Sequence, residues 1–214
     1  MKKYILGLAV ACLTTSLFAQ GTVLFNTHNT SFGISMRVYA PEPGSETIAK
    51  YGNTATQIPA GTQTYGGALL AGSDWTAQLW AAAGANAAES SLAAALPTTT
   101  FRTGSAAGIV NPTTATLTGV PLDAPVATVQ LRVFPATFAT WEAAEAAWLA
   151  DATGTVWIGK SQLLNLEAIG GNLNTPPLMA GMESFSLVAN IIPEPSTFAL
   201  LGLGALGMFL FRRK

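Results

Sequence analysis

Short segments in which apolar and polar residues alternate recur along the middle of the chain. In residues 34–39 (ISMRVY) every second residue is apolar. In residues 126–134 (VATVQLRVF) one set is wholly apolar, and the other set carries Thr128, Gln130 and Arg132. Because successive side chains of a strand point to opposite faces, an alternation with a period of two predicts β-strands. Further candidate strands are residues 22–25, 75–80, 98–102, 114–120, 155–158 and 183–189.

Clusters of turn-forming residues separate these segments. Examples are residues 40–44 (APEPG) and 174–177 (NTPP), in which Gly, Pro and Asn favour turns. Short strands joined by such turns are typical of a sandwich. The pattern therefore predicts a mainly β fold, a β-sandwich of immunoglobulin or jelly-roll type, with one or two short helices.

One segment has the pattern of a helix that packs on a sheet. Residues 140–150 are rich in Ala, which favours helix, and Thr140 is a candidate N-cap. Trp141, Ala144 and Trp148 follow at the spacing of one helical stripe. We expect this stripe to face the core.

A second short helix is predicted in residues 86–96, where Pro97 ends the segment. No internal repeat and no long linker divides the surrounding sequence. We therefore expect one folded unit over residues 20–190, with its boundary just before Ile192.

The first nineteen residues have the order of a secretory signal peptide. Lys2 and Lys3 precede an apolar run at residues 5–13, and a polar stretch then leads towards Ala19. This order predicts cleavage between Ala19 and Gln20 during export by the secretion machinery. The apolar run is too short for a transmembrane helix, which needs about 20 residues.

The single cysteine of the chain, Cys12, lies inside this predicted signal segment. Cleavage with lipid attachment at Cys12 is an alternative, although the apolar run before it is very short for a lipoprotein signal. Without that modification the mature chain has no cysteine, so disulfides cannot contribute to its stability.

The carboxyl terminus combines a short motif, an apolar run and a basic cluster. These are, in order, Pro193, Glu194 and Pro195; residues 196–211; and Arg212, Arg213 and Lys214. The wholly apolar stretch from Phe198 to Phe211 would form a helix of about 21 Å, and one further turn from Pro195 brings it closer to the ~30 Å hydrocarbon core. We therefore predict a transmembrane helix at residues 196–211 with its basic end in the cytoplasm. A buried core helix is the alternative, but such a helix rarely ends in three cations.

In this order, the three features resemble the PEP-CTERM sorting domain of Gram-negative bacteria. The resemblance covers residues 192–214, with Ile192 where the family usually has Val. It implies that an exosortase in the inner membrane reads the motif and cuts near it. The protein then passes to the cell surface or the extracellular polysaccharide. Pro193, Glu194 and Pro195 would be recognition residues of a substrate, and residues 191–214 would form the sorting segment.

A second resemblance covers residues 126–186. The order of VQLRVF, WEAAEAAWLA, GKSQLLNLEAIGG and TPP is similar to PEP-CTERM proteins found in Verrucomicrobia, which are exported and have a predicted β-sandwich body. This resemblance supports the predicted fold. It implies no chemistry, because sorting signals of this kind accompany unrelated domains.

Charges are few and unevenly placed. Charged residues make up 10% of the chain, against about 25% in an average domain. Residues 20–192 hold five basic and ten acidic residues, a net charge of −5. Because an acidic surface repels phosphates, we expect no nucleic-acid partner.

Residue types for catalysis or metal binding are scarce. His28, the only histidine, lies in a polar segment (NTHNT) without a nucleophile motif, so we expect a surface or hydrogen-bonded residue. A single histidine without a thiolate cannot hold a metal unless several carboxylates join it. Glu142 and Glu145 lie on one predicted helix, and we expect a solvated face there instead of a glycosidase pair. The sequence therefore predicts no catalytic residue, no metal, no cofactor and no enzyme activity.

Tryptophans leave one binding function open. Trp75 and Trp80 have opposite parity in one predicted strand, so one of them can face outward as a platform for a sugar. Tryptophans of a small domain nevertheless lie mostly in the core. We therefore predict an exported, non-enzymatic surface or matrix protein, with a carbohydrate-binding module of the secreted exopolysaccharide as the alternative.

Overall fold

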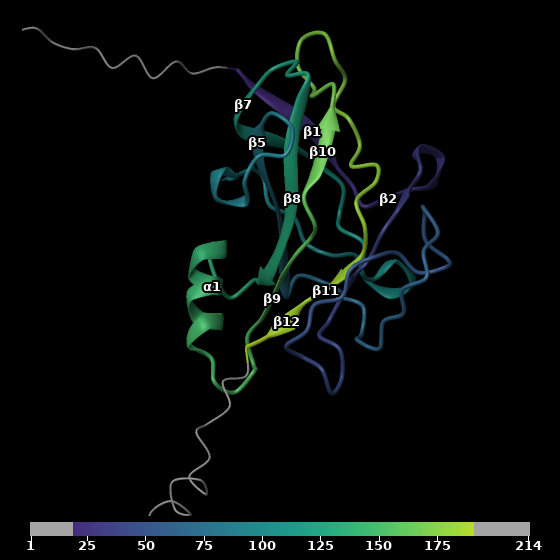
Figure 1. Cartoon of the computed structure of the whole chain (residues 1–214), viewed down its shortest axis with the longest axis vertical. Coiled ribbons are helices and arrows are strands. Elements are labelled where there is room, and N and C mark those ends of the chain that lie inside the picture. Colours follow the sequence, from purple (N-terminus) through teal and green to yellow (C-terminus); the bar gives the residue numbers. More distant parts are fainter. Residues whose placement is uncertain (1–18, 191–214) are drawn as a thin grey trace, which may run out of the picture.

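The computed structural model describes residues 19–190, most of which lie in or between short strands (Figure 1). The predicted signal segment up to residue 18 and the predicted transmembrane helix at residues 196–211 lie outside this range. The strands are β1 Gln20–Phe25, β2 His28–Asn29, β3 Ile34–Ser35, β4 Val38–Tyr39, β5 Trp75–Ala83, β6 Ala93–Ala94, β7 Thr113–Pro121, β8 Val126–Pro135, β9 Trp157–Lys160, β10 Leu164–Glu167, β11 Phe185–Ser186 and β12 Val188–Ala189. Within the described residues, α1 (Trp141–Ala150) is the one α-helix.

β5 and β8 form the centre of the largest sheet. They pair antiparallel from Trp75 opposite Pro135 to Ala83 opposite Ala127. β6 continues the sheet beyond β5, whereas β9 and then β12 continue it beyond β8. β10 pairs with the first half of β8, so β8 has neighbours on both edges for most of its length.

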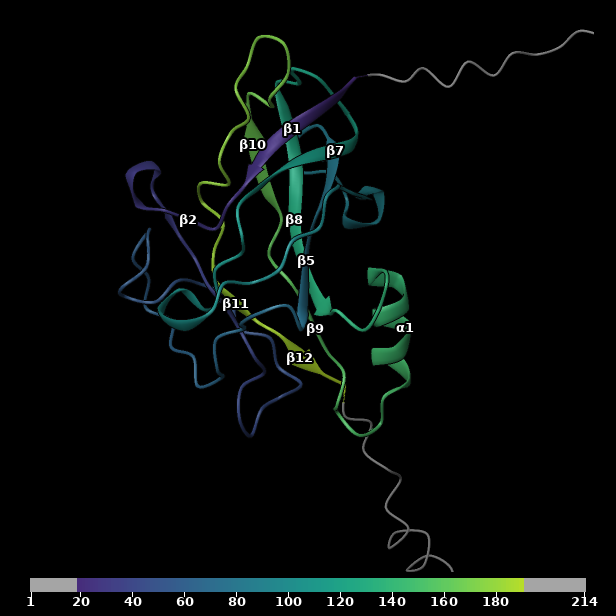
Figure 2. The ribbon, with the colours of Figure 1, turned by 180° about the vertical axis from the view of Figure 1, so that it is seen from behind.

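The main core lies between this sheet and the ladder of β1 and β7. β1 pairs antiparallel with β7, and β7 contacts β5. Figure 2 shows β1 and β7 crossing the upper part of β8. The apolar sets predicted from the alternation fill this core without exposed area: Ile34, Met36, Val38, Ala127, Val129, Leu131 and Val133. The strands predicted at residues 126–134 and 22–25 are thus confirmed.

The polar face of β8 is also buried. Thr128, Gln130 and Arg132 are at most 7% exposed, although alternation alone is typical of a strand with one solvated face. Their polar atoms find partners inside the protein. The Gln130 amide donates to the Ser161 carbonyl at 3.1 Å, and Arg132 Nε donates to Gln130 Oε1 at 2.9 Å. A second apolar cluster, which contains Trp80, Phe134 and Trp141, covers this face.

α1 supplies much of that cover, as its sequence predicts. The Thr140 side chain accepts a hydrogen bond from the Ala143 amide at 3.3 Å and caps the helix. Trp141 and Ala144 are buried, and Trp148 packs against the same cluster. The predicted helix and its inward stripe are therefore confirmed.

Three local predictions are wrong. Residues 98–102 form no strand, because Thr99 and Phe101 make only isolated bridges, to Ala77 and to Val110. Residues 86–96 form a 3₁₀ turn (Glu89–Ser91) and then β6, because backbone pairing with β5 satisfies their amides better than an isolated helix does. Residues 34–39 form two short strands with different partners, because β3 pairs with β2, β4 pairs with β11, and the Arg37 amide between them donates to the Ser184 hydroxyl at 2.8 Å. The mainly β class is confirmed, with several sheets and one α-helix in the described residues.

Candidate functional site

A polar groove opens beside the short ribbon of β2 and β3. Its volume is about 550 Å³, within the range of ligand sites. Polar side chains and two aliphatic ones line it: His28, Thr30, Ser35, Arg37, Tyr39, Thr56, Gln57, Ile58 and Leu69. We call these nine residues the β2–β3 groove. None of them is Asp or Glu, in a folded unit that is acidic as a whole.

Strand pairing fixes the position of the histidine in this groove. His28 lies directly opposite Ser35 in the β2–β3 register, and its Nδ1 is 3.0 Å from the Ser35 hydroxyl oxygen. The amide of His28 donates to the Asn26 side chain at 3.1 Å. His28 is thus the hydrogen-bonded residue that the sequence predicts, although it lies in a strand and not in a loop. A serine hydrolase also needs a carboxylate to orient the imidazole, and the groove lining provides none.

Arg37 brings a positive charge to the groove without an acidic partner in the described residues. Its Nη1 and Nη2 donate to the Ser105 carbonyl at 3.2 Å, and Nη1 also donates to the Ala107 carbonyl. Ion pairs elsewhere in residues 19–190 join Lys50 with Glu42, and Lys160 and Arg132 with Glu89. The Arg37 guanidinium is therefore held in place by neutral carbonyl oxygens.

Two stacked tyrosines separate this groove from the acidic side chains nearby. The rings of Tyr39 and Tyr65 are parallel within 1°, with centroids 3.9 Å apart. Burial raises the pKa of Tyr39, and the charge of Arg37 opposes this shift. Burial also raises the pKa of Tyr65, and the nearby Tyr39, Glu183 and Glu42 add to the effect. Both phenols therefore stay protonated at neutral pH, with Arg37 acting on one ring and the carboxylates on the other.

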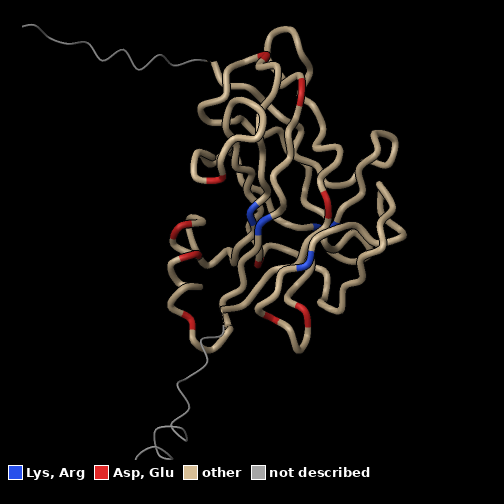
Figure 3. The backbone as a smooth tube through the Cα atoms, viewed as in Figure 1, with Lys and Arg blue, Asp and Glu red and all other residues tan. Residues whose placement is uncertain are grey.

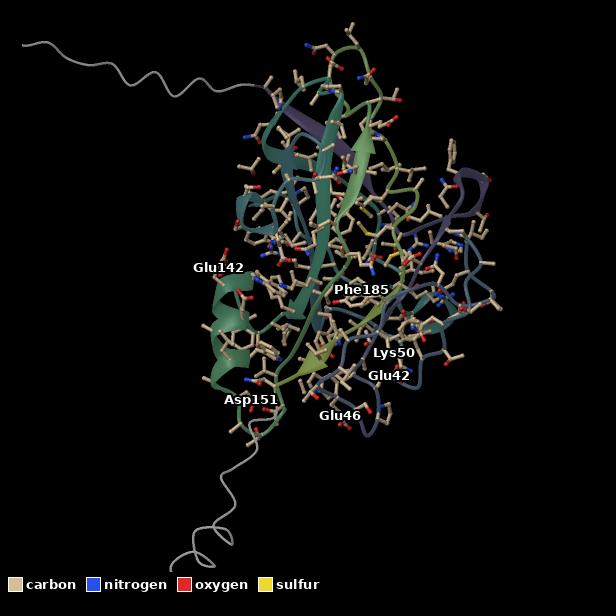
Figure 4. All side chains as sticks on the ribbon, viewed as in Figure 1. Glu42, Glu46, Lys50, Glu142, Asp151 and Phe185 are labelled. Atoms are coloured by element: carbon tan, nitrogen blue, oxygen red, sulfur yellow. The ribbon has the colours of Figure 1, made fainter. Side chains whose placement is uncertain are left out.

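Glu42 ties together the long loop region between β4 and β5. Its carboxylate accepts from Lys50 Nζ at 2.8 Å and from the Gly66 amide at 3.1 Å. Figure 4 shows Glu42 and Lys50 side by side below β11. Burial opposes ionisation of Glu42, but the hydrogen bonds from Lys50, Gly66 and Gly67 hold its pKa below the ordinary value. These contacts give Glu42 a structural role.

Asp123 and Asp151 organise loops in the same manner. Asp123 accepts hydrogen bonds from three successive amides of residues 172–174, and these bonds lower its pKa. Asp151 accepts from the side chain of Thr153 and the amide of Val156, which hold its pKa far below the usual range. Carboxylates saturated by such donors are poor candidates for proton transfer.

A second depression lies between α1 and the 3₁₀ turn at residues 89–91. Its volume is about 400 Å³, and it is open to solvent. The Arg132 guanidinium carbon lies 3.9 Å from the ring centroid of Trp80 and 5.2 Å from that of Trp141. Glu89 binds Lys160 and lies 3.6 Å from Arg132; burial opposes its ionisation, but Lys160 lowers its pKa. The Glu89 carboxylate of this depression is thus neutralised by Lys160 and Arg132.

The acidic pair Glu142 and Glu145 lies at the rim of this depression. Glu142 is exposed, and Glu145 accepts a hydrogen bond from Trp141 Nε1 at 3.2 Å. Both come from one helix, as the sequence predicts, and both face the buried Arg132. Within residues 19–190 there is no group of three His, Cys, Asp or Glu side chains that could hold a metal ion.

The two tryptophans predicted as a sugar platform lie on opposite faces of β5. Trp75 packs on the main core, and its ring stacks with that of Trp157 at 6.0 Å and 8°. Trp80 belongs to the second cluster, is 8% exposed, and has the Arg132 guanidinium over its ring. One face of each indole is therefore already occupied by a protein side chain.

Beyond the folded body, the comparison with protein families gives a single finding. The model of the PEP-CTERM protein-sorting motif matches residues 192–214. The chain carries a PEP-CTERM sorting signal. A PEP-CTERM signal implies an exported, membrane-associated precursor that an exosortase processes. No curated protein and no solved structure matches the chain.

The PEP-CTERM signal begins almost directly at the folded body. The Asn190 side-chain amide donates to the carbonyl oxygens of Trp148 and Leu149, at 3.0 and 3.1 Å, in the last turn of α1, where the Trp148 carbonyl also accepts from the Asp151 amide. Trp148 Nε1 in turn donates to the Val188 carbonyl of β12 at 3.1 Å. Between Asn190 and Pro193 there are only Ile191 and Ile192.

The other residues predicted to act in export and sorting lie at or beyond the ends of the described range. Gln20 begins β1, and the carbonyl of Ala19 accepts from the Leu122 amide at 3.1 Å. The sorting residues Pro193, Glu194 and Pro195 and the basic residues Arg212, Arg213 and Lys214 lie outside it. Residues 19–190 contain no helix of the length and apolarity needed to span a membrane.

Proposed function

We propose that the protein is a non-enzymatic component of the cell surface or extracellular matrix, delivered there by exosortase processing. The observation that carries this proposal is the PEP-CTERM motif at residues 192–214, directly after the folded body. Both its position and its order of motif, apolar run and basic cluster fit a sorting signal on an exported passenger.

The chemistry of the folded body supports a role without catalysis. The Ser35–His28 contact has no carboxylate in its groove, and Asp123 and Asp151 are occupied by loop amides. Glu89 is neutralised by Lys160 and Arg132. Asp123, Asp151 and Glu89 are therefore engaged in holding the structure.

We further propose the division of the chain that the sequence suggests. Residues 1–19 are the signal peptide, cleaved between Ala19 and Gln20, and residues 20–190 are the exported domain. The helix at residues 196–211 anchors the precursor in the inner membrane of a Gram-negative cell, with the basic tail in the cytoplasm. The ladder of β1 and β7 facing β5 across the main core supports a β-sandwich for the domain.

The test is the mass and location of the protein in its host, with and without exosortase. We expect a wild-type product outside the inner membrane that lacks Met1–Ala19 and the segment after about Pro195. In cells without exosortase, the tail should remain and hold the protein in the membrane. A tail retained in wild-type cells would contradict the sorting route and leave a simple membrane anchor.

A matched pair of variants makes this test specific for the motif. Glu194→Gln changes the predicted recognition residue, whereas Glu183→Gln removes the same charge from an exposed position of the folded body. We expect the first variant to accumulate as the uncut precursor and the second to be processed normally. Equal processing of both variants would show that the exosortase does not recognise the Glu194 side chain.

A further inference from the structure

We propose that the β2–β3 groove binds a sugar residue that carries a carboxylate, such as a uronic acid unit of an acidic polysaccharide. This inference goes beyond the proposed function and does not depend on the sorting route. It gives the carbohydrate-binding alternative a site that differs from Trp75 and Trp80.

The first argument is the charge of the groove. Arg37 supplies its positive charge, and none of the nine lining residues is acidic. The surrounding domain has a net charge of −5 over residues 20–192, so this groove is an exception on an acidic molecule. Figure 3 shows that most acidic residues lie towards the margins of the molecule, whereas Lys and Arg lie in its middle. A carboxylate in the groove would provide the partner that Arg37 lacks among the described residues.

The second argument is the orientation of the Arg37 guanidinium. The hydrogen bonds to Ser105 and Ala107 use three of its five N–H groups, all of them on Nη1 and Nη2. Nε–H and the second hydrogen of Nη2 remain, and a guanidinium presents such a pair as a fork that fits both oxygens of a carboxylate. Because the backbone carbonyls already fix the side chain, binding costs little further rotamer entropy.

The third argument is the supply of groups that can both donate and accept. The hydroxyls of Thr30, Ser35 and Thr56 line the groove together with the His28 ring, and with Gln57, whose side-chain oxygen already accepts from the Thr54 amide and the Ser184 hydroxyl. Each hydroxyl can donate one hydrogen bond and accept two, which suits the hydroxyl groups of a sugar. The contact of Ser35 with His28 holds the buried hydroxyl and the imidazole in fixed positions.

The apolar side chains of the groove suit the C–H faces of a sugar ring. Ile58 and Leu69 contribute aliphatic surface, and Tyr39 a half-buried ring whose hydroxyl accepts from Gln57 at 3.2 Å. A pyranose ring has apolar C–H faces and polar edges, so it uses both kinds of surface. A nucleic acid would bring phosphates to an acidic domain and would be repelled over most of its length.

The test is a binding measurement by calorimetry on the full chain purified in detergent micelles. The probes are oligogalacturonate, a neutral dextran oligomer and a sulfated dextran oligomer of similar length. We expect binding of oligogalacturonate and at least tenfold weaker binding of the neutral oligomer, since the neutral oligomer lacks the carboxylate that would pair with Arg37. Absent binding, equal binding of the neutral oligomer, or equal binding of the sulfated oligomer would overturn the proposal.

Variants at one exposed position of the groove locate the site. Thr56 is exposed, so Thr56→Glu and Thr56→Gln are both compatible with the fold, and they differ only in a carboxylate. We expect Thr56→Glu to bind oligogalacturonate at least tenfold more weakly than Thr56→Gln does, because only the first variant places a negative charge beside the bound carboxylate. Equal affinity of the two variants would show that the sugar binds elsewhere.

A second comparison tests Arg37 itself. Arg37→Met should reduce binding at least tenfold, whereas Arg102→Met, which removes the same charge outside the groove lining, should not. A circular dichroism melt of each variant separates lost binding from lost folding. Competition by a short peptide with a free carboxyl terminus, at the affinity of the sugar, would contradict a saccharide ligand.

Discussion

Individual carboxylates in this protein act mainly as acceptors that hold loops in place. Glu42 joins the Lys50 ammonium to the Gly66 amide, Asp123 binds the backbone of residues 172–174, and Asp151 closes the turn after α1. Each of these acceptors has a pKa below its ordinary value, because the donors favour the ionised form. The same property makes the stability of the fold depend on pH.

Glu42 is the clearest case for a measurement. Its folded pKa lies below its unfolded value of about 4.3, so its contribution to stability is present above that pH and is lost as the pH falls through the folded pKa. We expect Glu42→Gln to lower the free energy of unfolding by about 1–3 kcal/mol at pH 7, as for a weakened hydrogen bond to a charged group. Denaturation in urea at pH 7 and at pH 3 measures this, and the difference from wild type should shrink at pH 3.

Glu167→Gln is the matched control for this prediction, because Glu167 is exposed on β10. It should leave stability near the wild-type value at both pH values. A difference between Glu42→Gln and wild type that is equally large at pH 3 would show that the loss arises from packing and not from ionisation.

At the scale of the elements, periodicity predicted what contacts the main core but not what covers the second face of the sheet. The inward residues of β8 and the stripe of α1 follow directly from spacing, as does the Thr140 cap. The spacing does not predict the burial of Gln130 and Arg132, because this burial depends on α1 and the 3₁₀ turn at residues 89–91, which meet over β8. The groove residues escaped prediction for the same reason: residues 28–39 and 56–69 meet only in the folded chain.

α1 should contribute strongly to stability through one residue. Trp141 is 1% exposed and packs edge-on against Phe134, with ring centroids 6.2 Å apart. Trp141→Ala should therefore lower the free energy of unfolding by about 3–5 kcal/mol, the usual cost of such a cavity. Leu149→Ala, at a position of the same helix that is 59% exposed, should change it by less than about 0.5 kcal/mol. Similar values for the two variants in urea denaturation would show that α1 does not seal this face.

β9 leaves no room for a side chain where the C-terminal strands cross it. A Cβ at Gly159 would lie 2.6 Å from a methyl carbon of Leu187 and 3.1 Å from its Cα. Gly159→Ala should therefore destabilise the fold by about 1–3 kcal/mol through overpacking. It should also speed hydrogen exchange at the Leu187 amide, which donates to the Tyr39 carbonyl at 2.8 Å, because the added methyl group displaces Leu187. Gly66→Ala, where contacts would be ordinary at 3.4 Å, is the control, and equal exchange in both variants would contradict this prediction.

At the scale of the whole molecule, the folded body and the sorting signal are closely joined. α1 and β12 meet at Asn190, and the PEP-CTERM motif follows after two residues. An enzyme that cuts near the motif must therefore approach the end of a folded domain, where Asn190 contacts the last turn of α1 and Asp151 lies close by (Figure 4). If the folded domain hinders this approach, a longer connection between the domain and the motif should make the motif more accessible.

A spacer between body and motif tests this consequence. Insertion of ten Gly and Ser residues after Asn190 adds a flexible segment of up to about 35 Å when extended. If the folded body hinders access to the motif, the inserted chain should be processed faster than wild type in a pulse-chase experiment. The same insertion at residues 31–33, an exposed turn after β2, lengthens the protein without altering this corner and should not change the rate. Equal rates for all three proteins would show that exosortase reaches its motif unhindered at the surface of the folded domain.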